Sequence, residues 1–125
     1  MSAWIAVALG GAVGAVARYT LSLIFPFNAD KFPVATFVAN ASGCLLMGIF
    51  YYLIFGKAAI SSDLKPLVMV GFLGALTTFS TFSLEVLQLV QNGLASLAIA
   101  YAIASLLVSI SCVAGGYYLM KWFSL

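Results

Sequence analysis

The residues most able to do chemistry form one continuous run in the middle of an otherwise apolar sequence. The run consists of hydroxyl and phenyl side chains: Thr77, Thr78, Phe79, Ser80, Thr81, Phe82 and Ser83. Gly71 and Gly74 precede it and Glu85 follows it, where a membrane helix is normally most apolar. Hydroxyl groups at membrane depth cost free energy unless they face one another or a wet cavity. The run therefore indicates a site, and we expect an ion as its occupant.

The backbone beside this run offers ligands for a small cation. Glycines and an interrupted helix leave carbonyl oxygens without their usual hydrogen-bond donors, and such oxygens suit a hard cation. Gly74 and Thr77 are the positions at which we expect free carbonyls.

Other groups can bind an anion. The hydroxyls of Ser80, Thr81 and Tyr101 can donate hydrogen bonds. Phe79 and Phe82 are three residues apart, so their rings lie on one helix face. A phenyl ring has a positive edge, and two rings presented edge-on form a weak anion-binding surface that excludes water. From the spacing alone, ordinary helix packing is the favoured explanation of these two rings.

Membrane-spanning helices must position these side chains. The chain has 125 residues, of which 65% are hydrophobic and 6% charged, and its mean hydropathy is +1.19. A spanning helix needs about 20 mostly apolar residues. We predict four spans, at about 3–24, 33–55, 66–91 and 94–122. They occupy the whole length, so we expect an all-α integral membrane protein in which residues 1–125 are a single domain.

The third span should be broken near its middle. It is longer than a straight crossing requires, and two glycines followed by β-branched and hydroxyl residues form helix poorly. We place the break between about Gly74 and Phe79. A break at membrane depth must line a cavity or be buried in protein.

Polar residues also interrupt the second and fourth spans. Asn40 must face a partner or water, and both helix contact and pore lining remain open for it. Tyr101, Ser105 and Ser109 recur every four residues, which places them on one helix face. Opposite a polar break, we interpret these three residues as one polar track.

Two charges lie inside predicted spans. Arg18 and Glu85 each fall about six residues before the end of a span, and the first and third spans run in the same direction. A charge at a helix centre costs about 2.5–3.5 kcal/mol on insertion scales. We therefore expect Arg18 and Glu85 to line an aqueous entrance or to anchor helix ends there.

The remaining charges are few and scattered. Lys57, Lys65 and Lys121 are predicted on one side of the membrane, and Lys31, with Arg18, on the other. This bias is small, so the chain could insert in either orientation. With no basic cluster we expect no nucleic-acid partner.

Enzymatic chemistry is not expected. The sequence has no histidine and three acidic residues, which removes most acid–base and metal chemistry. We interpret Cys44 and Cys112 as small apolar residues within their spans.

Three motifs carry a family resemblance. Gly10, Gly11, Gly14 and Arg18 form G-G-x-x-G-x-x-x-R, and Thr36, Asn40 and Gly43 form T-x-x-x-N-x-x-G, with Ala35 before the threonine. The third motif is the central run from Gly71 to Glu85, with Ala75 where a second glycine is common. Together these motifs resemble the Fluc (CrcB) fluoride channels over essentially the full length.

The resemblance implies a passive fluoride-selective channel that exports cytoplasmic fluoride across a bacterial inner membrane. It implies an antiparallel homodimer of dual topology, with two pores and a central structural sodium ion. Backbone carbonyls of Gly74 and Thr77 from both copies would hold the sodium. The fluoride pathway would correspond to Asn40, Phe79, Ser80, Thr81, Phe82, Tyr101, Ser105 and Ser109.

Two other functions fit the sequence less well than a fluoride channel does. A small dual-topology proton-coupled multidrug exporter needs a carboxylate at mid-membrane depth, commonly early in the chain, and the first span has none. A non-transporting assembly subunit would explain the small residues of the first span, but not a broken span rich in hydroxyls and paired rings.

Overall fold

Helices form in each of the four predicted spans. The computed structural model describes residues 1–56 and 61–124, and Lys57 lies outside these residues. The elements are α1 (Ala3–Ile24), α2 (Val34–Phe55), η1 (Lys65–Leu73), α3 (Gly74–Leu76), α4 (Ser80–Gln91) and α5 (Ala95–Phe123). The described residues contain four helical stretches long and apolar enough to cross a membrane, the third being Lys65–Gln91. The predicted limits agree to within one residue, so the protein is a multi-pass membrane protein.

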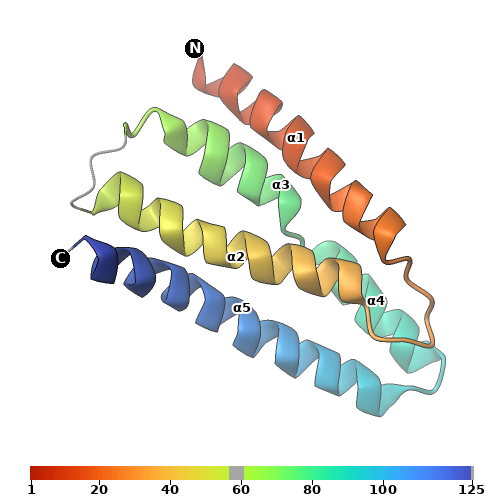
Figure 1. Cartoon of the computed structure of the whole chain (residues 1–125). Coiled ribbons are helices and arrows are strands. Elements are labelled where there is room, and N and C mark those ends of the chain that lie inside the picture. The colour runs from red at the N-terminus through yellow and green to blue at the C-terminus, as the bar shows by residue number, and fades with distance from the viewer. Residues whose placement is uncertain (57–60, 125) are drawn as a thin grey trace.

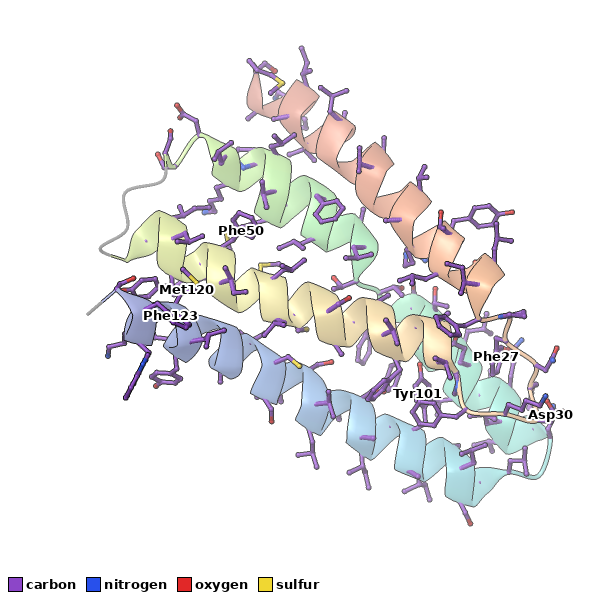
Figure 2. All side chains as sticks on the ribbon, in the orientation of Figure 1. Phe27, Asp30, Phe50, Tyr101, Met120 and Phe123 are labelled. Carbon is purple, nitrogen blue, oxygen red and sulfur yellow. The ribbon has the colours of Figure 1, made fainter. Side chains whose placement is uncertain are left out.

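Both termini lie at the same end of the bundle (Figure 1). Because α2 and α5 are the second and fourth crossings, they run in the same direction side by side, whereas α1 and η1 run opposite to α2. The Phe27 and Asp30 side chains mark the other end, where α1 connects to α2 (Figure 2).

The third span is broken between Leu76 and Ser80, inside the predicted interval. Thr77 is extended, with φ −83° and ψ 150°, so the helix stops there. Before the break, η1 is wound as a π-helix, and the Gly74 N–H reaches the Met69 carbonyl five residues back. Such wide turns are rare and often mark functional sites. The break lets the span change neighbours, because η1 packs on α1 whereas α4 packs on α5.

Close backbone contact holds η1 against α1. A Cβ at Gly10 would lie 2.0 Å from the Leu67 carbonyl oxygen, and one at Gly14 would lie 2.2 Å from that of Phe72. A Cβ at Gly11 would meet nothing within 4 Å. Gly10 and Gly14 therefore let the first span approach the third span closely, as small residues do between membrane helices.

A regular series of residue contacts, called the α2–α5 ladder below, joins α2 to α5. A Cβ at Gly48 would lie 2.0 Å from the Val113 carbonyl oxygen, and the rings of Tyr52 and Tyr117 are 5.5 Å apart. Each pair is separated by 65 positions in the sequence (113 − 48 and 117 − 52). The two parallel helices therefore keep one sequence offset along their contact, and a contacting pair recurs every four residues.

Candidate functional site

Asn40 holds the break in its shape. Its side-chain Nδ2 donates to the Thr78 carbonyl over 3.0 Å, and the Thr78 N–H donates to its Oδ1 over 2.8 Å. The amide therefore pairs with the backbone as a second peptide group would, and it satisfies two groups that the interrupted helix leaves open. Asn40 is a helix contact and also lines the cavity described below, so the two predicted roles coincide.

The carbonyls expected to be free are free within the described residues. The Thr78 N–H, which would reach Gly74 in an unbroken helix, bonds to Asn40 instead, so the Gly74 carbonyl has no protein donor there. The Thr77 carbonyl likewise has no protein donor in residues 1–56 and 61–124. Gly74 is exposed and Thr77 half-buried, and both residues line the cavity described below.

Hydroxyl groups and one guanidinium cover the other side of the break. The Arg18 Nε donates to the Ala75 carbonyl over 3.0 Å, and its Nη1 lies 3.5 Å from the Thr81 Oγ1. The Thr78 Oγ1 lies 3.3 Å from the Thr81 Oγ1 and 3.2 Å from the Ser80 Oγ. Arg18 therefore binds the C-terminal end of α3, which is the helix end that the break creates.

A cavity of about 410 Å³ opens at the break, between α2 and α5. Of the predicted pathway residues, those lining it are Asn40, Phe79, Phe82, Ser105 and Ser109. Ser80, Thr81 and Tyr101 do not line it. The Phe79 and Phe82 rings are 5.3 Å apart, and Phe79 is 72% exposed whereas Phe82 is buried. Hydrogen-bond donors and two phenyl rings therefore line one cavity.

The Tyr101 hydroxyl belongs to a different cluster of hydrogen bonds, centred on Glu85. Its hydroxyl donates to the Glu85 Oε2 over 2.7 Å, and the Thr36 hydroxyl donates to Oε1 over 2.7 Å. Glu85 is buried, and Figure 2 shows Tyr101 where α5 meets α2 and α4. The Tyr101 hydroxyl therefore cannot donate to an ion while it donates to this carboxylate.

Arg18 and Glu85 line a second cavity of about 300 Å³, together with Thr36 and Thr81. Across the described parts of the chain the two charges form no direct ion pair, although they share this space. The guanidinium can donate hydrogen bonds to an ion there, whereas the Thr36 and Tyr101 hydroxyls already donate theirs to the carboxylate.

Thr36 and Cys44 line the two cavities although they were not predicted as site residues, whereas Thr78 was named only as a member of the central run. Thr36 and Cys44 lie four residues before and after Asn40, so α2 carries the same four-residue spacing as Tyr101, Ser105 and Ser109 on α5. The offset is again 65 positions, as for Gly48 and Val113. Comparing the four-residue spacing of the second and fourth spans would have identified Thr36 and Cys44. Thr78 contacts Asn40 through its backbone and Thr81 through its hydroxyl, and the spacing of residues does not predict the backbone contact.

The sequence is similar to those of known proteins. Residues 5–117 match the family model described as CrcB-like protein, Camphor Resistance (CrcB). A protein of Saccharophagus degradans named fluoride-specific ion channel FluC is 51% identical over 110 residues, covering 88% of this chain and 83% of the relative. Relatives of the same name from Magnetococcus marinus and Desulfotalea psychrophila are 48% and 40% identical. The alignments cover 92% and 97% of this chain, and 90% and 94% of those two proteins.

Proposed function

This chain belongs to the CrcB-like family, and we propose that it is a fluoride-selective passive channel that exports cytoplasmic fluoride from a bacterium. The observation that carries the proposal is the cavity at the break, where Asn40, Ser105 and Ser109 meet the Phe79 and Phe82 rings. The relatives are named as channels, so transport rather than enzymatic turnover is the activity to test.

The cavity suits a small, strongly hydrated anion. Hydroxyl and amide donors replace the water donors of the ion, and the positive edges of the two rings exclude bulk water. Fluoride needs short hydrogen bonds from closely spaced donors, whereas larger halides need more room, so small rigid sites favour fluoride. The residues that line this cavity include no carboxylate and no histidine to carry a proton with the ion, which is consistent with passive flux.

Growth in fluoride tests this function in cells. A bacterial strain made fluoride-sensitive by loss of its own export should grow at higher fluoride concentrations when it expresses this chain. Expression of the Asn40→Asp variant at the same level is the matched control, because it changes one atom of the amide that lines the cavity. Equal sensitivity with and without the wild-type chain contradicts the proposal.

We further propose that the working unit is an antiparallel homodimer inserted in both orientations in the inner membrane. Lipid cannot satisfy bare backbone groups, so protein must cover the exposed Gly74 and the outward carbonyls of the break. A second copy offers the same break and the same exposed Phe79. Native mass spectrometry in detergent tests this, because it should record twice the mass of one chain.

A structural sodium ion fits the centre of that dimer. Gly74 and Thr77 supply two free, hard carbonyl oxygens from each copy, and sodium when bound supplies a fixed positive charge that attracts anions. Sodium should therefore raise the thermal midpoint of the purified protein more than an equal concentration of N-methylglucamine. No difference between the two cations contradicts a sodium site.

A further inference from the structure

Arg18 contacts both sides of the break from α1. Its Nε donates to the Ala75 carbonyl over 3.0 Å, in the last turn before the break, and its Nη1 lies 3.5 Å from the Thr81 Oγ1, in the first turn of α4. The planar guanidinium holds its N–H donors in a fixed fork. These two contacts therefore restrain how the end of α3 lies relative to the start of α4.

The Ala75 carbonyl falls, in the sequence, between the two carbonyls proposed as sodium ligands. In an unbroken helix it would accept from the Phe79 N–H, and that bond is absent in the part of the chain that the structure describes. Arg18 therefore satisfies a carbonyl that the break would otherwise leave without a donor. Because a hard cation accepts any such oxygen, an unbonded Ala75 carbonyl would compete with those of Gly74 and Thr77.

Arg18 and the proposed sodium ligands lie on different sides of the break. Arg18 lines the cavity of about 300 Å³, whereas Gly74 and Thr77 line the cavity of about 410 Å³. Successive carbonyls of a helix point about 100° apart around its axis. Holding the Ala75 carbonyl toward α1 therefore also sets the direction of the Gly74 carbonyl, without any contact between the guanidinium and that oxygen.

We propose that Arg18 is a positioning residue for the structural sodium ion, which holds the carbonyls of Gly74 and Thr77 in the arrangement that binds the cation. Asn40 restrains the same segment from α2, so both neighbouring helices hold the break. Residues that orient metal ligands typically change the metal affinity by about 10–100-fold when they are substituted. The inference rests on the proposed sodium site.

The charge of Arg18 alone predicts the opposite effect on sodium. A guanidinium beside the break is a positive charge near a cation site, and like charges repel. If Arg18 acted only through its charge, its removal would tighten sodium binding. If Arg18 positions the carbonyls, its removal weakens sodium binding. The direction of the change therefore separates the two explanations.

Thermal unfolding of the purified protein in detergent measures the sodium affinity. Sodium chloride replaces N-methylglucamine chloride at constant ionic strength, so that the screening of charges stays the same. A ligand that binds only the folded protein raises its stability progressively once the free concentration exceeds Kd, so the rise of the midpoint with sodium gives Kd. A general loss of packing lowers every midpoint but leaves this Kd unchanged.

Three variants are compared with the wild-type chain. Arg18→Gln removes both the charge and the fork of donors, whereas Arg18→Lys keeps the charge and removes the Nε donor. Lys31→Gln is the matched control, because it removes one positive charge from the connection between α1 and α2. Lys31 is exposed and lines neither of the two cavities at the break.

We expect Arg18→Gln and Arg18→Lys each to raise the Kd for sodium by about 10–100-fold, while Lys31→Gln keeps the wild-type value. Equal or tighter sodium binding by Arg18→Gln overturns the inference, as does wild-type affinity in Arg18→Lys, because charge would then be sufficient. Equal weakening by Lys31→Gln also overturns it. If one Arg18 variant does not fold, the other decides alone.

The wild-type chain separates this inference from the proposed channel function. A wild-type midpoint that does not respond to sodium overturns the sodium site and this inference together. Fluoride flux from liposomes is measured on the same preparation, and it tests the channel independently of the sodium titration.

Discussion

Asn40 is the residue on which the shape of the break depends. Its amide completes both hydrogen bonds of the Thr78 peptide and leaves the Gly74 carbonyl without a donor. One side chain therefore supports both proposed functions of the central run, the freed carbonyls and the donor-lined cavity, and Gly74 and Thr77 line that cavity too. An asparagine is the natural choice because it is both donor and acceptor.

Asn40→Asp should impair fluoride flux more than Asn40→Ala. The carboxylate repels the anion and also faces the Thr78 carbonyl without a hydrogen to donate, whereas alanine only leaves the Thr78 groups unpaired. Loss of a buried pairing costs about 1–3 kcal/mol of stability. Flux and thermal midpoint are measured on both purified variants. Normal flux through Asn40→Asp would show that Asn40 is a helix contact alone.

The two phenylalanines should respond differently to the same substitution. Phe79→Ile and Phe82→Ile should each slow fluoride flux, because both rings line the cavity. Only Phe82→Ile should also lower the stability of the protomer, by about 1 kcal/mol, because Phe82 is buried against Tyr101 whereas Phe79 is 72% exposed. Liposome flux and thermal unfolding measure the two effects. Normal flux through both variants would refute a role for the rings.

At the scale of elements, the break is useful because it lets one span serve two neighbours. Before the break η1 is fixed on α1 by glycine contacts, and after it α4 packs on α5 through Phe82, Leu89 and Tyr101. The α2–α5 ladder then aligns Asn40, Cys44 and the serines along one cavity.

Gly14→Ala should disturb the first of these contacts, whereas Gly11→Ala should not. The new Cβ at position 14 would lie 2.2 Å from the Phe72 carbonyl oxygen, so α1 and η1 must separate. At position 11 the Cβ meets nothing within 4 Å. We expect Gly14→Ala to cost about 1–3 kcal/mol and to lower the thermal midpoint in detergent. Equal midpoints for the two variants would contradict this packing.

The sequence predicted the four spans and the break because both depend on local composition. Apolar length sets the spans, and glycines followed by hydroxyl residues set the break near Thr77. The partners of the polar groups were not predictable in this way. That Tyr101 bonds Glu85, and that Arg18 bonds Ala75, follows from which helices pack together. Such long-range pairing leaves no mark in a single sequence.

At the scale of the whole molecule, a single protomer exposes backbone groups that lipid cannot satisfy. The exposed backbone at Gly74 and the exposed ring of Phe79 need a protein surface opposite them. A second antiparallel copy would supply that surface and would account for a sequence whose charge bias hardly specifies orientation.

The most direct test of the fluoride channel is ion release from liposomes. Vesicles loaded with equal fluoride and chloride, and containing the purified protein, are followed with electrodes for both ions. We predict rapid loss of fluoride, retention of chloride and no requirement for a proton gradient, with much slower loss through Asn40→Asp. Retention of fluoride by vesicles that contain folded wild-type protein, or fluoride loss only when a proton gradient drives it, would contradict the account.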